Sequence, residues 1–175
     1  MKHYWIAIVL AVFGAAMGWQ FGLQHNQQTE TPATDYSTHT LPEELWHNLD
    51  GGENRLSEWQ GKTLIINHWA TWCEPCRREI PMFMAVREEY RDRGVELIGI
   101  AHDNEEDVRR FVDSMGMDYP QLLAGLGQGQ KWLAQLGSNG SLPLTLVFDR
   151  EGNLRARKLG LMSEQELQAA IKAVL

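Results

Sequence analysis

The feature that most constrains the fold is a junction within residues 64–90, where an apolar run meets a segment with helical spacing. The run Leu64–Trp69 is mostly apolar on consecutive positions, as expected of a strand buried on both faces of a sheet. It leads into Trp72–Cys76, after which apolar residues recur at intervals of three and four, at Ile80, Phe83, Val86 and Tyr90. A buried strand followed by an amphipathic helix predicts an α/β domain.

The same order recurs further along the chain. Val95–Ala101 predicts a second buried strand, and the helix after it carries an apolar stripe and stops at Gly116. Strand, helix, strand and helix in this order indicate a parallel core. Leu144–Phe148 predicts a third strand, which turns into an antiparallel partner over Leu154–Leu159.

Shorter elements complete the predicted domain. Ser163 and Glu166, three positions apart, match a capping box that starts a terminal helix. We also expect a strand ending in a hairpin turn at Leu45–Leu49 and a helical turn at Leu56–Trp59. A short extended piece is expected at Gln121–Leu123, and a short helix at Gln128–Leu136.

The N-terminal segment has a different character. Tyr4–Leu23 is almost continuously apolar over 20 positions, and an α-helix needs about 20 residues to cross a membrane. We therefore expect a transmembrane anchor in residues 1–24, with a cleaved signal peptide, cut near Ala15–Ala16, as the alternative. Residues 25–40 are polar and predict a flexible linker, whereas residues 41–175 have the length of one globular domain.

Charge and cysteine content argue against several kinds of protein. A net charge of -7 disfavours a nucleic-acid partner, because such binding rests on a basic surface that releases counterions. Two cysteines cannot form a scaffold of several bridges, so the apolar core holds the fold. We expect no metal site, because zinc needs four ligands and no paired spacing is found among the histidines His3, His25, His39, His47, His68 and His102.

Cys73 and Cys76 have the spacing that dithiol chemistry requires. Two thiols exchange with a foreign disulfide when the second can release the first from the mixed disulfide. Cys73, at the predicted helix start, is favoured as a thiolate by unpaired N–H groups and the helix dipole, so it is the expected nucleophile. Cys76 lies one turn inside and is the expected resolving thiol, while Pro75 suits the first helical turn. A purely structural staple is disfavoured because so short a loop contributes little closure entropy.

Two carboxylates lie close to the cysteines in sequence. Negative charge near a thiolate raises the pKa of the thiol, so Glu74 and Glu79 oppose the helix dipole. If Glu79 is buried, it can carry protons as a general acid and base. The alternative is that Glu74 is a solvated charge and that Glu79 belongs to a helix charge pattern with Arg77 and Arg78.

The stretch Asn67–Cys76 resembles the strand-to-helix junction of thioredoxin-fold oxidoreductases, and it looks most like the membrane-anchored TlpA/ResA-type branch. Three further segments match this pattern, namely Gly61–Lys62, Arg77–Pro81 and Leu142–Thr145. The resemblance covers about residues 41–175. It implies a thioredoxin-like fold with a mixed central sheet and flanking helices, and an inserted strand and helix over Arg109–Leu136.

The resemblance also assigns expected roles. In the family the proline that matches Pro143 is cis and faces the cysteines, and the residue matching Leu142 offers backbone hydrogen bonds to the client. Asn67 stands where plain thioredoxins have a buried aspartate, so proton transfer falls to Glu79. His68 replaces a more usual aromatic residue. We place client binding on a surface made by Trp72, Glu74, Pro75, Leu142 and Pro143.

These expectations combine into a thiol–disulfide oxidoreductase that reduces disulfides of extracytoplasmic clients, such as apocytochrome c, with Cys73, Cys76 and Glu79 as catalytic residues and no cofactor. Lys2 precedes the apolar segment and the next lysine or arginine is Arg55, which places the domain outside the cytoplasmic membrane. The oxidised pair then needs a membrane-embedded thiol donor. We expect a monomer, released into the periplasm if the segment is cleaved.

Three alternatives stay open. A disulfide-forming oxidase would use the same cysteines and differ in redox potential. A thioredoxin-fold peroxidase wants a threonine three positions before its reactive cysteine, where this chain has Ala70. A tethered, non-catalytic module would bind clients through Trp72 and its neighbours.

Overall fold

The computed structural model describes residues 39–125 and 127–175. The anchor predicted in residues 1–24 and nearly all of the predicted linker lie outside these ranges, so both stay predictions. Within the described ranges, no helix combines the length and the apolar character needed to cross a membrane.

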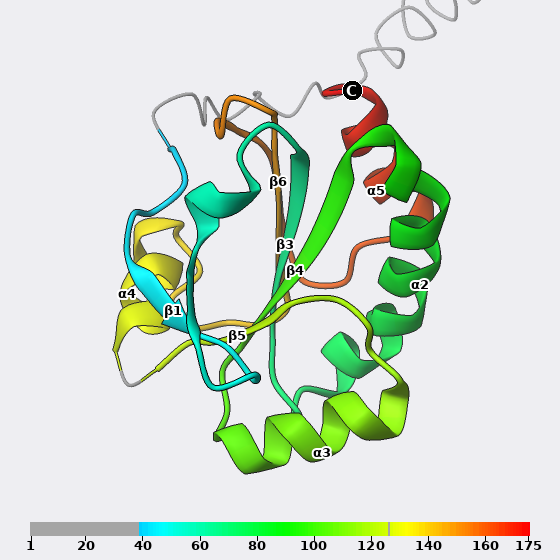
Figure 1. Ribbon diagram of the computed structural model, residues 1–175. Coiled ribbons are helices and arrows are strands. Elements are labelled where there is room, and N and C mark those ends of the chain that lie inside the picture. Colours follow the sequence, from blue (N-terminus) through cyan, green and yellow to red (C-terminus); the bar gives the residue numbers. More distant parts are fainter. Residues whose placement is uncertain (1–38, 126) are drawn as a thin grey trace, which may run out of the picture. The chain divides into compact units, whose positions relative to one another are not determined.

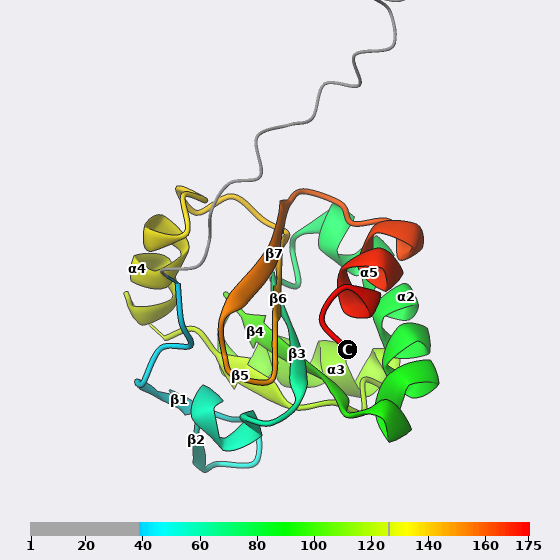
Figure 2. The ribbon, with the colours of Figure 1, turned by 90° about the horizontal axis from the view of Figure 1, so that it is seen from above.

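The domain is built on a mixed five-stranded sheet (Figures 1 and 2). In spatial order its strands are β5 (Gln121–Leu123), β4 (Val95–Ala101), β3 (Thr63–Trp69), β6 (Leu144–Phe148) and β7 (Leu154–Leu159). The central strand β3 pairs in parallel with β4 and antiparallel with β6, and β7 closes the far edge antiparallel to β6. All seven residues of β3 are buried, as its mostly apolar sequence predicts.

Two layers cover the sheet, and both figures place them on opposite sides of it. One layer contains α2 (Glu74–Tyr90), α3 (Glu105–Met115) and α5 (Glu164–Lys172), which pack on a core that includes Ile65 and Trp69. The other contains α4 (Gln128–Gln135), the hairpin of β1 (Leu45–His47) and β2 (Glu53–Arg55), and η1 (Leu56–Trp59). Successive residues of β3 therefore point alternately into the two layers.

Local signals set the helix ends. Asn104 caps α3 by accepting a hydrogen bond from the Asp107 N–H, and Gly116 ends that helix with a φ of 65°. The capping box predicted for Ser163 and Glu166 starts α5. Helix α2 is followed by η2 (Arg91–Arg93), which ends at Gly94, whose backbone is in the left-handed conformation.

Candidate active site

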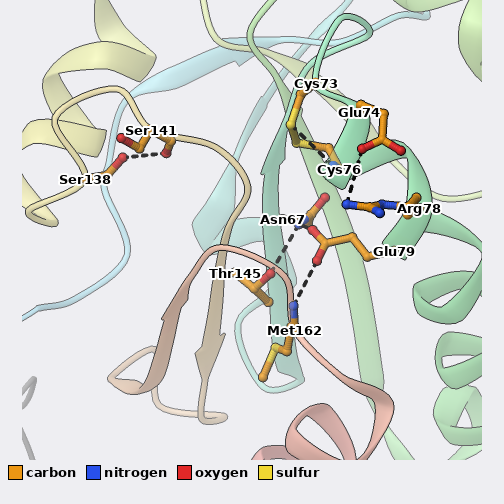
Figure 3. The surroundings of a disulfide bond; sticks show 10 residues. All are labelled: Asn67, Cys73, Glu74, Cys76, Arg78, Glu79, Ser138, Ser141, Thr145 and Met162. Atoms are coloured by element: carbon orange, nitrogen blue, oxygen red, sulfur yellow. Dashed lines mark hydrogen bonds and ion pairs between the residues drawn. A yellow bond between two sulfur atoms is a disulfide. The ribbon is translucent and has the colours of Figure 1, made fainter.

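The two cysteines lie where β3 ends and α2 begins (Figure 3). They form a disulfide with a sulfur–sulfur distance of 2.03 Å and a Cα–Cα distance of 5.3 Å. Cys73 is the N-cap residue of α2, and its Sγ accepts a hydrogen bond from the Cys76 N–H at 3.3 Å. Pro75 is the second residue of the helix, where a missing N–H leaves no intrahelical bond unmade. The sulfur of Cys73 thus caps the N-terminus of α2.

The two sulfur-bearing residues differ in burial. Cys73 keeps 4% of its surface exposed, whereas Cys76 is fully buried. An incoming thiol or disulfide therefore meets Cys73 first. In the reduced pair, the free N–H groups of the first helical turn and the helix dipole favour the thiolate at Cys73.

Glu79 lies one turn beyond Cys76 and points into the core rather than to solvent, with 3% of its surface exposed (Figure 3). Its Oε1 accepts a hydrogen bond from Asn67 Nδ2 at 2.9 Å, and its Oε2 accepts one from the Met162 N–H at 3.2 Å. Burial raises the pKa of Glu79 to about 7, against the two hydrogen bonds, which act to lower it. This carboxyl can hold or release a proton near neutral pH.

The alternative prediction, a charge pattern of Glu79 with Arg77 and Arg78, is wrong. Arg78 instead pairs with Glu74, one turn earlier, at 3.2 Å. Both of these side chains are exposed, so their ion pair contributes at most about 1 kcal/mol. The guanidinium of Arg77 lies over the ring of Phe111 at 5.6 Å.

The segments that carry the predicted client-binding residues adjoin the end of the central strand β3. Trp72, directly before the nucleophile, is 68% exposed. The Leu142–Pro143 peptide bond is cis, and the next residue, Leu144, pairs with His68 near the end of β3. The cis bond therefore lies near the end of β3, from which the cysteine loop leaves. The Pro143 carbonyl accepts a hydrogen bond from the Gly160 N–H at 2.8 Å.

Neighbouring side chains fix the loop that carries the cysteines. The Thr71 hydroxyl donates a hydrogen bond to the carboxylate of Asp103, beyond the end of β4. The indole N–H of Trp69 donates to Gln121 Oε1 at 3.0 Å. These bonds, to the segment after β4 and to β5, hold Thr71 and Trp69 in place just before the dithiol.

A pair of histidines on the other face of the sheet was not predicted. His68 Nδ1 lies 2.9 Å from His102 Nε2, and the His68 ring packs on Trp132 of α4. Burial is the largest cause that lowers both pKa values, that of His68 well below its usual range and that of His102 to about 4. Histidine spacing in the sequence gives no sign of this pair, because the register of two parallel strands brings the rings together.

No group of three or more histidine, cysteine, aspartate or glutamate side chains suited to a metal ion is found in residues 39–125 and 127–175. The redox group of the site is the disulfide itself.

A cysteine pair at the helix that follows the central strand of such a sheet defines the thioredoxin-like disulfide oxidoreductases. The chain belongs to the AhpC/TSA family, which it matches over residues 30–157. The resemblance seen in the sequence is confirmed at this level.

Relatives and solved structures agree with this class. The chain is 28% identical to the thiol-disulfide oxidoreductase ResA of Geobacillus kaustophilus, with 95% of this chain and 92% of that protein covered. It is 28% identical to the thioredoxin-like protein YneN of Bacillus subtilis, with 96% of each covered. A crystal structure of a thiol:disulfide interchange protein from Chlorobium tepidum is 27% identical, with a TM-score of 0.69 over 77% of this chain and 94% of that one.

Proposed function

We propose that the protein reduces disulfides of extracytoplasmic client proteins by dithiol exchange. The observation that carries the proposal is the unequal burial of two bonded cysteines on one helical turn, with a buried carboxyl of raised pKa on the next turn. This arrangement gives one sulfur that clients can reach, one that they cannot, and a group that exchanges protons.

The reaction begins with the reduced pair. The Cys73 thiolate attacks a client disulfide, so a sulfur–sulfur bond forms between Cys73 and the client and one client sulfur leaves as a thiolate that takes up a proton. The Cys76 thiol then loses its proton, and its sulfur attacks Cys73 Sγ and expels the second client sulfur. The client gains two electrons and two protons, and the protein ends with the Cys73–Cys76 disulfide.

Glu79 serves as the proton carrier in this scheme. Its carboxylate accepts the proton of Cys76, three residues earlier on α2, and returns it to the leaving client sulfur. A carboxyl with a pKa of about 7 is half-ionised near neutral pH, so it can perform both transfers. An ordinary glutamate would be ionised almost throughout and would be a poor acid.

We further propose that the domain works outside the cytoplasmic membrane, tethered by Tyr4–Leu23. The length of this apolar segment and the basic residue before it support the proposal. A membrane-embedded thiol donor would return two electrons to the disulfide after each cycle. Apocytochrome c is the client class that we propose first, from the resemblance to the ResA-type proteins.

The decisive experiment is client trapping. Cys76→Ser should accumulate mixed disulfides through Cys73, because the resolving thiol is missing, and mass spectrometry of the trapped proteins identifies the clients. Cys73→Ser is the matched control and should trap nothing. If Cys73→Ser traps clients and Cys76→Ser does not, the assigned roles are reversed.

The direction of electron flow needs its own measurement. The wild type should reduce insulin disulfides, and its equilibrium with glutathione should give a reducing potential. A potential as oxidising as about -120 mV, the value for a strong oxidant, would contradict the reductase. Client binding that survives replacement of both cysteines, in a wild type that leaves insulin unreduced, would favour a binding module instead.

A further inference from the structure

Asn67 lies at the centre of the polar group beside the disulfide, and its hydrogen bonding is incomplete. The side chain is fully buried. Its Nδ2 donates to Glu79 Oε1 at 2.9 Å and to Thr145 Oγ1 at 3.2 Å, from α2 and β6 respectively (Figure 3). Its Oδ1 is buried without a hydrogen-bond partner. An amide with one end bonded twice and the other unbonded is an unusual arrangement in a protein core.

The two partners of Asn67 share a chemical property. A hydroxyl such as that of Thr145 donates as readily as it accepts, and a glutamic acid donates once it takes up a proton. Turning the amide end over end exchanges Oδ1 with Nδ2 in nearly the same volume. In the turned orientation, Oδ1 would accept from both partners, and Nδ2 would be the end without bonds.

The position of the proton on Glu79 follows from its other oxygen. Oε2 is held by the Met162 N–H, which can only donate, so this oxygen serves as an acceptor in both protonation states. The proton therefore belongs on Oε1, the oxygen that faces Asn67. Oδ1 of that same amide is a buried acceptor without a partner. A second titratable group that interacts with Glu79, the buried phenol of Tyr119, keeps its proton because burial raises its pKa.

We propose that Asn67 is a two-position amide gate. It donates Nδ2–H to the Glu79 carboxylate, and it turns over when Glu79 is protonated, so that Oδ1 accepts the new O–H and the Thr145 hydroxyl. The role deepens the proposed reductase, because it lets a buried carboxyl keep a partner while it receives and returns a proton. Asn67 acts through Glu79 and is a positioning residue.

The gate also gives a reason for asparagine at this place in the core. An aspartate here would be a second buried carboxylate beside Glu79, and the like charges would prevent both from ionising. A leucine of similar volume would offer neither a donor nor an acceptor. Asparagine alone among side chains of this size carries both at two ends that can be exchanged.

The test uses the oxidised, full-length chain, in which the cysteines do not titrate, so that its outcome is independent of reductase activity. Side-chain amide NMR signals of Asn67 are followed together with the carboxyl carbon of Glu79 while the pH is varied. We expect the bonded Nδ2 proton to lose its downfield shift as Glu79 is protonated, with the same midpoint as the carboxyl carbon. Glu79→Gln is the matched control and should abolish this transition.

A fixed amide gives a different result. If the Nδ2 proton keeps its hydrogen-bonded shift on both sides of the Glu79 midpoint, Asn67 is a permanent donor and the gate is wrong. Neutron diffraction on crystals held on either side of the midpoint provides a second measurement. The Asn67 amide atom that faces Glu79 Oε1 should carry deuterons at a pH above the Glu79 midpoint, where it is Nδ2. It should carry none below the midpoint, where it is Oδ1. Failure of client trapping in a protein that passes this test would overturn the reductase and leave the gate intact.

Discussion

Asn67 and His68, two consecutive residues of the central strand, point to opposite faces of the sheet. Comparing them shows how burial changes the pKa of neighbouring groups. Asn67 faces α2 and contacts a carboxyl whose pKa burial raises to about 7. His68 faces α4 and contacts a histidine whose pKa burial lowers to about 4. Both residues are fully buried, and each has one polar atom without a partner. Burial disfavours charge on either face, so the acid keeps its proton and the base gives its proton up.

The elements that cover the two faces decide which one carries redox chemistry. On one face, α2 supplies Cys76 and Glu79 three residues apart. On the other, α4 supplies the Trp132 ring and Gly129, which lies directly against His102. The acid titrates near neutral pH beside the dithiol, whereas the histidine pair stays neutral at that pH. We infer that the first face is catalytic and the second structural.

The largest expected difference between the faces is in catalytic rate. Glu79→Gln should lower the rate of disulfide reduction by about a hundredfold near neutral pH, the typical effect of losing a general acid and base. It should also remove the change in rate near pH 7 that protonation of Glu79 produces. His102→Gln should leave both close to the wild type. The measurement is the rate of insulin reduction as a function of pH. Equal losses of rate in the two variants would show that the two faces do not differ in catalysis.

A substitution on the α4 face should lower stability and leave the catalytic rate unchanged. A Cβ on Gly129 would lie 2.4 Å from the Ala124 Cβ and 2.9 Å from His102 Cε1, both closer than side chains tolerate. Gly129→Ala should therefore lower the free energy of unfolding by about 1–3 kcal/mol, measured by urea denaturation. The neighbouring, exposed Gln130→Ala is the control and should change it by less than about 0.5 kcal/mol. The folded fraction of Gly129→Ala should retain the wild-type rate of insulin reduction.

The pH dependence of stability should separate the faces with the smallest signal. The pKa of Glu79 is about 7 in the folded chain and 4.5 ordinarily, so its contribution is complete below pH 4.5 and is lost as the pH rises towards 7. The histidines have folded pKa values below 6.5, so their contribution is complete above pH 6.5 and is lost as the pH falls towards those values. The two faces therefore act in opposite directions between pH 4.5 and 6.5.

Removing the titratable groups of one face should leave the contribution of the other face to the pH dependence of stability. Glu79→Gln should make stability rise more steeply with pH in this window, by up to about 1.4 kcal/mol per pH unit. A variant with His68→Phe and His102→Leu should make it rise less steeply or fall. Urea denaturation at several pH values measures both slopes, and groups common to all variants cancel in the differences. Parallel slopes in all three proteins would show that neither face is linked to protons as described.

The elements and the dithiol could be predicted because their signals are local. Val95–Ala101 forms a strand with the predicted bounds, and Gly116 ends the preceding helix where expected. Cys73 is placed at the helix start by the apolar run before it and the helical spacing after it. Each of these features depends on residues within a few positions of one another.

The surroundings of the dithiol could not be predicted, because their partners are distant in sequence. Glu79 accepts from the N–H of a residue 83 positions away, and Asn67 donates to Thr145 across 78 positions. The histidine pair depends on parallel register, in which His68 lies opposite Ile100, so that His102 falls just beyond the paired strands. Register is fixed by packing of the whole sheet and cannot be derived from either strand alone.

The difference in burial between the two cysteines has a practical consequence for counting reduced molecules. A bulky alkylating reagent added to the reduced protein should modify Cys73, which keeps some exposed surface, and leave Cys76, which has none. Each reduced chain would then gain a single adduct, and each oxidised chain none. Intact-mass spectra of such a mixture would report the proportion of reduced protein in a cell extract, without an antibody or an added enzyme.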